Sequence, residues 1–170
     1  MDDIPDFKIS PADISDVPLI LSLVRELAEY ERLSHMVVAT EDMLRRQLFG
    51  AQACAQVVIA RENNQPVGFA LYFWNFSTFL GKPGLYLEDV FVRPPFRGKG
   101  YGKALLLHLA GLAKKRGCGR FEWSVLDWNE PAIKFYESLG AVGMHQWKLY
   151  RVTGDALDKL ATQADCELLP

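Results

Sequence analysis

The stretch of sequence that decides the fold is Leu85-Tyr-Leu-Glu-Asp-Val-Phe-Val-Arg-Pro-Pro-Phe-Arg-Gly-Lys-Gly-Tyr-Gly102. Its near-continuous apolar run, Leu85–Val92, predicts a strand that is covered on both faces of a sheet, and Pro94–Pro95 ends that strand. A helix is predicted from about Gly100 to Arg116, where leucines recur at helical spacing. Alternating glycines in the connection let the backbone approach a ligand closely and point N–H groups outward. At the N-terminus of a helix, such a loop predicts an anion site.

The spacing of the glycines does not match other phosphate-binding loops. A Walker loop ends in Gly-Lys-Ser/Thr, which is absent here. The dinucleotide fingerprint GxGxxG also fails, because Gly98, Gly100 and Gly102 are each two residues apart. A glycine-rich turn without a ligand is the alternative interpretation, and the strand–loop–helix context argues against it.

The remaining chain predicts one α/β domain over residues 1–170 with a mixed sheet, because antiparallel strands precede a strand–helix–strand alternation. The further strands are expected at 7–10, 57–60, 67–76, 121–125 and 147–152, and the polar turn Arg61–Pro66 predicts that the second and third of them form a hairpin. The further helices are expected at 13–32, at 40–50 with Thr40 as its N-cap, and at 130–139, with an amphipathic tail at 155–161.

Composition excludes several classes of protein. The chain has 170 residues, of which 49% are hydrophobic and 24% charged, with a net charge of −2. Its basic clusters are short, so neither nucleic acid nor an anionic membrane is an expected partner. No apolar run approaches the roughly 20 residues of a membrane span, and Met1–Asp3 does not begin a signal peptide. We therefore expect a cytoplasmic protein.

The cysteines give no sign of a disulfide or a metal site. Cys54, Cys118 and Cys166 are odd in number and far apart, with no CxxC pair. We expect no structural metal and no covalent acyl intermediate on cysteine.

Two carboxylates interrupt the apolar strand. Since successive strand side chains alternate, Glu88 and Asp89 are predicted to lie on opposite faces of the sheet. A buried carboxylate needs a partner or water, and burial raises its pKa into the range of a general base. A purely structural role for either residue is the alternative.

A second distinctive segment runs from Val125 to Ala141. Asn129 is a good N-cap, and Pro131 is tolerated in the first turn of the helix that follows. Tyr136 lies on the apolar stripe of this helix and is, on that basis alone, more often a core residue than a catalyst. Its phenol can nevertheless deliver a proton to a leaving group.

Arg97–Gly102 fits the Q/R-x-x-G-x-G/A signature, and the chain resembles the GNAT superfamily of N-acetyltransferases over nearly its whole length. The resemblance implies a GNAT fold, with a mixed sheet of six to seven strands flanked by helices. It also implies acetyl-coenzyme A as donor, with loop amides on the pyrophosphate, the strand on the pantetheine arm and Tyr136 as general acid. The implied coenzyme-binding residues are Val90, Phe91, Val92, Arg97, Gly98, Lys99, Gly100, Tyr101, Gly102, Lys103, Asn129, Pro131 and Tyr136.

The Leu-Glu-Asp at 87–89 and the Arg-Glu-Leu-Ala-Glu-Tyr-Glu-Arg-Leu at 25–33 resemble the spermidine/spermine (diamine) and thialysine N-acetyltransferases. This resemblance implies that Tyr30 and Glu31 line the acceptor site with Asp89, and that Glu88 binds and deprotonates the amine, through water. Phe76–Lys82 is closer to the thialysine-preferring relatives. A primary amine of a small diamine, polyamine or lysine-like molecule is therefore the expected acceptor.

The first predicted helix carries Glu26, Glu29, Tyr30 and Glu31 close to His35, a face that suits a cationic amine, although such a mixed-charge helix can simply be solvated. Two alternatives stay open: acetylation of a protein or antibiotic amine, and an idle acyl-coenzyme A-binding domain. The expected mechanism is direct transfer in a ternary complex, with the Val90 amide on the oxyanion. A homodimer is implied by resemblance alone.

Overall fold

The computed structural model describes residues 6–167; Met1–Asp3 and the side chain of Cys166 lie outside the described residues. The chain divides after Ser124 into two compact units. The prediction of one domain over residues 1–170 joins these units and stays a prediction.

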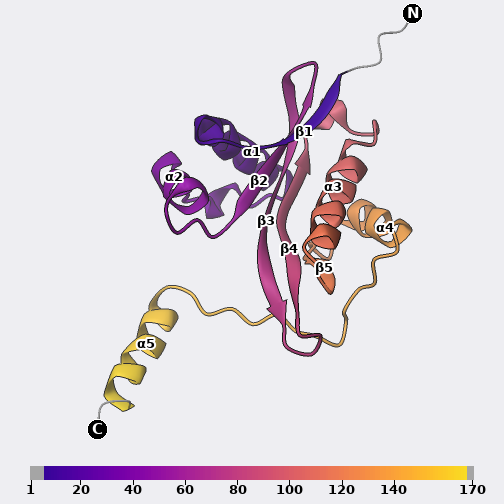
Figure 1. The fold of residues 1–170 in the computed structure, drawn as a ribbon. Helices are drawn as coiled ribbons and strands as arrows, with labels where there is room; N and C mark the ends of the chain where they lie inside the picture. The colour runs from indigo at the N-terminus through magenta and orange to yellow at the C-terminus, as the bar shows by residue number, and fades with distance from the viewer. Residues whose placement is uncertain (1–5, 168–170) are drawn as a thin grey trace, which may run out of the picture. The chain divides into compact units, whose positions relative to one another are not determined.

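The first unit is built on a five-stranded sheet in the order β1-β2-β3-β4-β5. Neighbours from β1 to β4 are antiparallel, whereas β5 is parallel to β4 (Figure 1). The connection from β4 to β5 runs through helix α3, as a parallel pair requires. The strands are β1 Phe7–Pro11, β2 Gln56–Glu62, β3 Gln65–Ser77, β4 Lys82–Val92 and β5 Arg120–Trp123.

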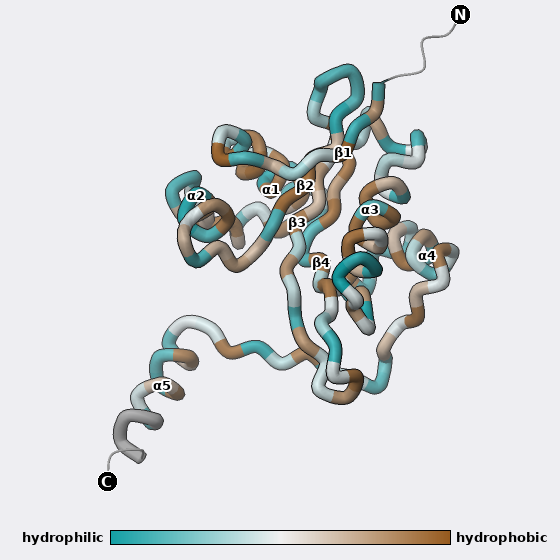
Figure 2. Tube along the Cα trace, in the orientation of Figure 1, coloured by the Kyte–Doolittle hydropathy of each residue, from teal (hydrophilic) through white to brown (hydrophobic). Residues whose placement is uncertain are grey.

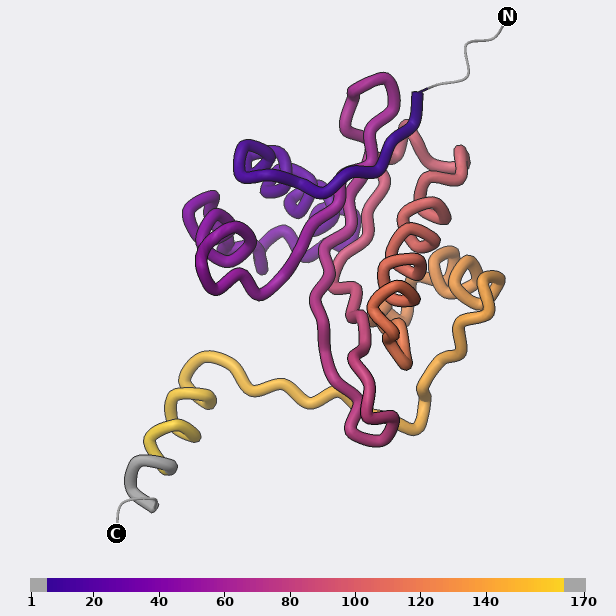
Figure 3. Tube along the Cα trace, in the orientation of Figure 1, coloured from indigo at the N-terminus to yellow at the C-terminus, as the bar shows by residue number. Residues whose placement is uncertain are grey.

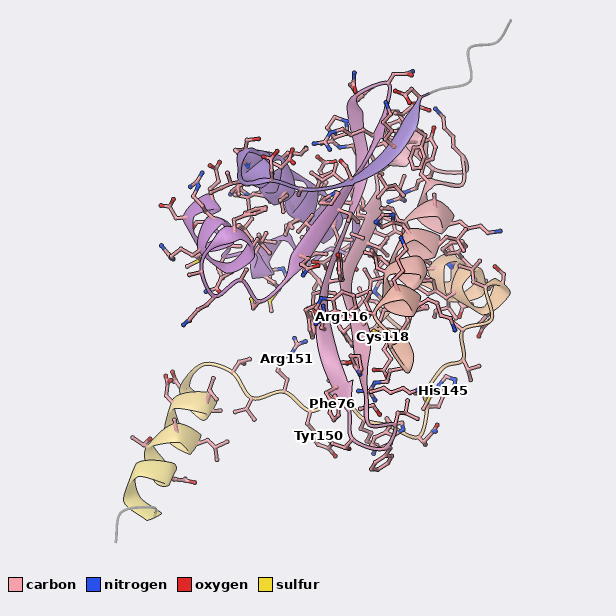
Figure 4. All side chains as sticks on the ribbon, viewed as in Figure 1. Phe76, Arg116, Cys118, His145, Tyr150 and Arg151 are labelled. Atoms are coloured by element: carbon pink, nitrogen blue, oxygen red, sulfur yellow. The ribbon has the colours of Figure 1, made fainter. Side chains whose placement is uncertain are left out.

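Helices cover both faces of this sheet. Helices α1 (Val17–Tyr30) and α2 (Glu41–Phe49) lie on one face, and α3 (Tyr101–Lys115) lies on the other (Figures 1 and 3). The inner stripe of α1 packs on β2, β3 and β4, and apolar segments line the strands (Figure 2). Each fully buried leucine or isoleucine stabilises the unit by about 1.5–3 kcal/mol. This packing core consists of Ile20, Leu23, Leu27, Leu48, Val57, Ile59, Phe69 and Phe91.

Local chemistry explains where these elements begin and end. The side chain of Thr40 accepts a hydrogen bond from the amide of Met43, so α2 begins at the predicted N-cap. Asn63 and Asn64 have φ angles of 50° and 63°, which fits a two-residue hairpin turn with both central residues left-handed. The predicted hairpin of β2 and β3 is therefore confirmed.

The second unit contains helix α4 (Glu130–Ser138) and helix α5 (Asp155–Glu167). The strand predicted at 147–152 is wrong: this stretch has no regular secondary structure, and Trp147, Leu149 and Tyr150 are 67%, 79% and 86% exposed. A strand needs a hydrogen-bonded neighbour, and none pairs with this stretch in the described chain.

The predicted fold class is confirmed as a mixed α/β sheet flanked by helices, with five strands within residues 6–167 rather than six to seven. Within the same range, none of the helices is both long and apolar enough to cross a membrane. Cys54 and Cys118 are free thiols.

Candidate active site

The second half of β4 has a strand partner on one side only. β5 pairs with β4 from Gly84 to Leu87, whereas the residues from Asp89 to Val92 pair with β3 alone in the described sheet. An unpaired strand edge can hydrogen-bond an extended ligand.

Two hydrogen bonds show which backbone groups face this open edge. The amide of Arg93 donates to the carbonyl of Val67 on β3, whereas the carbonyl of Val92 accepts from Nε of Arg97 at 2.9 Å, outside the ladder. Because strand backbone groups alternate with period two, the amides of Val90 and Val92 face the open edge. Phe91 faces β3 and is 4% exposed, which favours Val90 and Val92 over Phe91 as backbone ligands.

The glycine loop leads directly from this edge into α3. Gly98 and Gly100 have φ angles of 79° and 85°, a backbone conformation that residues with a side chain rarely adopt. A Cβ at either position would meet no neighbouring atom. Glycine is therefore required at these two positions by the positive φ angles and not by lack of space. Gly100 is the N-cap of α3 and has no capping side chain, so the first amides of the helix are left for another acceptor.

A β-bulge interrupts β4 at Glu88. Leu71 of β3 is opposite Asp89 and Tyr72 is opposite Leu87, so Glu88 is the extra residue. The prediction that Glu88 and Asp89 lie on opposite faces assumed regular alternation, and the bulge makes that assumption wrong. Directly opposed residues share a face, and Leu71 packs against the α1 and α2 core. Asp89 therefore points to the face where α1 ends.

Three carboxylates come together at that point. Burial, then the negative charges of Glu88 and Glu31, raise the pKa of Asp89 to about 6. Burial also raises the pKa of Glu31, the residue that ends α1. Glu88 is exposed, whereas Asp89 and Glu31 are half-buried. The acidic cluster, defined as Glu31, Glu88 and Asp89, is therefore a place where a cation would be stabilised.

Tyr30 lies between this cluster and the glycine loop. The guanidinium of Arg97 is 4.3 Å from the centre of the Tyr30 ring and 5.6 Å from that of Phe91. This contact shows that the Tyr30 ring can hold a cation on its face. It also joins the end of α1, on the predicted acceptor side, to the first residue of the predicted donor loop.

Glu26 does not belong to the acidic cluster, although it lies on the same helix. Arg93 donates to both of its carboxylate oxygens, at 2.8 and 2.6 Å, and to the carbonyl of Pro66 at 2.9 Å. These hydrogen bonds lower the pKa of Glu26. Glu26 thus serves to fix α1 to the end of β4, and Glu29 and His35 are exposed.

The remaining predicted residues lie on α4 in the second unit. The side chain of Asn129 accepts from the amide of Ala132 at 3.4 Å, as expected for an N-cap, and Pro131 is in the first turn. The ring of Tyr136 is 5.5 Å from that of Phe135. The catalytic role of Tyr136 stays a prediction.

Sequence reasoning missed the ion pairs around the site. The sequence indicates no partner for either Arg93 or Glu62. A charged residue at the end of an apolar strand is the one local sign of such an ion pair, but many strand ends carry charged residues that only contact solvent. The partners are 37 and 67 residues away, so the sequence does not reveal them.

An open strand edge, a glycine loop and an acidic cluster can hold an extended anionic donor beside a cationic acceptor. Such an arrangement fits a transferase that uses two such molecules. The Acetyltransferase (GNAT) family model matches residues 20–141, and the chain belongs to this family. The prediction of an acetyl-coenzyme A-dependent N-acetyltransferase is confirmed.

Individual relatives agree with this assignment. The chain is 36% identical over 198 residues to the L-ornithine N5-acetyltransferase of Arabidopsis thaliana, covering 90% of this chain and 87% of that protein. It is 36% identical over 165 residues to the thialysine N-epsilon-acetyltransferase of Mus musculus, covering 91% and 96%. A solved integron cassette protein of V. cholerae is similar with a TM-score of 0.78 and 31% identity, covering 91% and 97%.

Proposed function

We propose that this enzyme transfers acetyl from acetyl-coenzyme A to a primary amine of a small diamine, a polyamine or a lysine-like acceptor such as thialysine. The observation that carries the proposal is the acidic cluster beside the open edge of β4. Three carboxylates there face no cation of their own in the described contacts, whereas Glu26 and Glu62 each have one. A protonated amine supplies the missing charge.

The donor would extend along β4 and end at the glycine loop. The amides of Val90 and Val92 would receive the pantetheine arm, and those from Gly98 to Lys103 would receive the pyrophosphate. Asn129 and Pro131 would add contacts to the coenzyme. In this arrangement the thioester carbonyl lies near Val90, whose amide would stabilise the oxyanion.

The acceptor would enter from the end of α1. Glu31 and Asp89 offer negative charge to the ammonium groups of a diamine or an amino acid side chain, beside the Tyr30 ring that already carries Arg97. Glu88 is exposed, so a water molecule can reach it and carry a proton from the amine. The relatives named for ornithine and thialysine act on amines of this size.

Direct transfer in a ternary complex balances without a covalent enzyme intermediate. The amine loses a proton to Glu88 through water, and its nitrogen attacks the thioester carbonyl. As the C–N bond forms and the C–S bond breaks, Tyr136 donates its proton to the leaving thiolate, and the resulting tyrosinate takes the second proton of the acetylated nitrogen through water. The products are an N-acetylated amine and coenzyme A.

The acceptor is tested by thiol release from acetyl-coenzyme A with spermidine, putrescine, thialysine, ornithine, lysine and N-terminal peptides. We expect the highest kcat/KM with one of the small diamine or lysine-like molecules. Highest activity on a peptide would replace this proposal with protein acetylation. Thermal stabilisation by acetyl-coenzyme A without thiol release for any amine would support an idle binding domain.

The general acid is tested by Tyr136→Phe, with Tyr150→Phe as the matched control because Tyr150 is 86% exposed. We expect Tyr136→Phe to lower kcat about 100-fold with little change in coenzyme binding. An unchanged kcat would remove Tyr136 from this role.

We also propose a cytoplasmic homodimer with no nucleic-acid or membrane partner. Light scattering of the purified protein would measure its mass against the 19.2 kDa of one chain. A monomeric mass would contradict the dimer.

A further inference from the structure

A buried carboxylate outside the acidic cluster lies under the glycine loop. Glu62, the last residue of β2, is 9% exposed, and it is one of three buried polar or charged residues among those described, with Ser77 and Asn129. The ammonium of Lys99 donates to its two oxygens at 2.9 and 3.2 Å, and the hydroxyl of Tyr101 donates to Oε1. Neither the transfer chemistry nor the amine uses Glu62.

The two donors flank the part of the loop that is hardest to hold in one shape. Lys99 lies between Gly98 and Gly100, whose φ angles are positive, and Tyr101 is the first residue of α3. Glycine loses more conformational freedom on ordering than any other residue. A restraint on both sides of Gly100 therefore reduces the entropy that the loop would otherwise lose on binding a ligand.

Glu62 and Tyr101 are themselves held against the first strand of the sheet. Phe7 of β1 is directly opposite Glu62, and its ring stacks on that of Tyr101 at 4.2 Å with 4° between the planes. The ammonium of Lys99 also lies 5.2 Å from the ring centre of Phe96, in the turn before the loop. The loop is thus held by residues at the ends of β1 and β2.

The charges persist over the pH range in which an enzyme of this kind works. Hydrogen bonds from Tyr101 and then Lys99 lower the pKa of Glu62, and the same contact with Glu62 raises the pKa of Tyr101 to about 12. The carboxylate therefore stays ionised and the phenol protonated at neutral pH. Because Glu62 engages the ammonium of Lys99, the backbone amides become the main anion ligands of the loop.

We propose that Glu62 is a positioning residue for the acetyl donor, holding Lys99 and Tyr101 so that the loop is already shaped for the diphosphate of acetyl-coenzyme A. This inference rests on the proposed function, in which the amides from Gly98 to Lys103 bind that diphosphate. Glu62 touches neither substrate. Its effect reaches the donor through the shape of the loop.

The test compares two donors in steady-state assays with the same amine: acetyl-coenzyme A, and S-acetylpantetheine, which lacks the diphosphate and nucleotide. We expect Glu62→Gln to raise the KM for acetyl-coenzyme A about tenfold, with kcat at saturation nearly unchanged. The ratio of kcat/KM for acetyl-coenzyme A to that for S-acetylpantetheine should fall by the same factor. A residue that only stabilises the fold would lower kcat/KM for the two donors by the same factor and leave their ratio unchanged.

Asp16→Asn is the matched control. Asp16 is also a largely buried carboxylate, and it pairs with Arg61, the neighbour of Glu62, at 2.6 Å, but it does not contact the loop. We expect this variant to lower thermal stability and leave the donor ratio unchanged. Tyr101→Phe removes a single hydrogen bond and retains the ring, so it serves if Glu62→Gln folds poorly; we expect a fall of about threefold in the ratio.

Gly100→Ala separates failure of this inference from failure of the proposed function. A side chain at a φ of 85° strains the loop, so the donor ratio should fall if the loop binds the diphosphate. An unchanged ratio in Gly100→Ala would overturn the loop assignment itself. A lower ratio in Gly100→Ala with an unchanged ratio in both Glu62→Gln and Tyr101→Phe would overturn only the role of Glu62.

Discussion

Asp89 and Glu62 are carboxylates at two places on one sheet, and their surroundings act in opposite directions. Burial and two like charges raise the pKa of Asp89 to about 6. Two hydrogen-bond donors lower the pKa of Glu62, although this residue is the more buried by surface area. Burial alone therefore does not separate the two.

The difference lies in whether the protein supplies the counter-charge. Glu62 has Lys99 and Tyr101, so its ionised form is stabilised in the free enzyme. Asp89 has Glu31 and Glu88 as neighbours, so its ionised form is destabilised until a cation arrives. A carboxylate with its own partners suits a fixed structural part, and one whose neighbours are like charges suits a binding site.

Asp89→Asn should have the largest effect. Because the variant removes a negative charge from the proposed amine site, we expect kcat/KM for a diamine to fall about 100-fold. It also removes a charge that is unfavourable in the folded protein, so the melting temperature at pH 7.5 should rise by roughly 5 °C. Steady-state kinetics and a thermal melt measure the two effects.

Glu41→Gln is the control for charge alone, since Glu41 is exposed on α2. It should alter kcat/KM less than twofold, as expected for a distant surface charge. If Asp89→Asn lowered both the melting temperature and the activity, Asp89 would stabilise the fold as Glu62 does, and the difference between the two residues would be contradicted.

The pH dependence of amine binding is the second expected effect. Asp89 has a raised pKa, so it becomes neutral as the pH falls through about 6, while the amine stays protonated. The KM for the amine should then rise about tenfold for each pH unit below 6. Glu31→Gln removes one of the charges that raise this pKa, so the midpoint should move to lower pH.

The KM for the amine in Asp89→Asn should no longer change over this pH range. If the same midpoint persists in that variant, another group controls amine binding. The KM for acetyl-coenzyme A provides an internal comparison, because the donor does not require Asp89.

The sequence indicated a functional role for Asp89 but not for Glu62. Asp89 stood out because a charge inside an apolar strand is unusual, and the glycine loop after that strand indicated the anion site. Glu62 stood at a strand end, where charges are common, and its partners are 37 and 39 residues away. Local patterns predict local elements, whereas such pairings depend on the register of β1, β2 and the loop.

The two errors in the prediction of strands have the same origin. The alternation at Glu88 and Asp89 failed because a bulge depends on how β3 pairs with β4. The strand at 147–152 failed because its side-chain pattern cannot supply a backbone neighbour. Elements with their own signals, such as α2 with Thr40 and the turn at Asn63–Asn64, were predicted correctly.

The effect of pH on stability should separate Glu62 from Asp89 by sign. Glu62 has a lowered pKa, so its contribution is present above the ordinary value of 4.5 and is lost as the pH falls through the lowered value. Asp89 binds its proton more tightly when folded, so its unfavourable effect grows from pH 3.8 to about 6 and is constant above.

Melting temperatures between pH 3 and 8 measure these differences. Glu62→Gln should lie below the parent protein by a constant amount above pH 5, and the gap should close at lower pH. Asp89→Asn should lie above the parent, with a gap that opens between pH 4 and 6. If the two differences in melting temperature had the same sign and the same pH dependence, Glu62 and Asp89 would not differ in their effect on stability.

The smallest expected effect is at Arg97, which joins the two regions. Arg97 starts the glycine loop, yet its guanidinium lies on the ring of Tyr30 at the end of α1 and its Nε donates to the carbonyl of Val92. Since an exposed cation–π contact is worth about 0.5–1 kcal/mol, Arg97→Gln and Tyr30→Leu should each raise the Kd for acetyl-coenzyme A about two- to fivefold. Tyr30 would then affect the donor from the acceptor side.

A double-mutant cycle decides whether this contact is the cause. Arg97→Gln combined with Tyr30→Leu should bind acetyl-coenzyme A no more weakly than Arg97→Gln alone, because the second change finds no contact left to remove. Isothermal titration of the four proteins measures the coupling. If the two losses add fully, Arg97 and Tyr30 act separately, and the donor loop and the acceptor helix respond to their ligands independently.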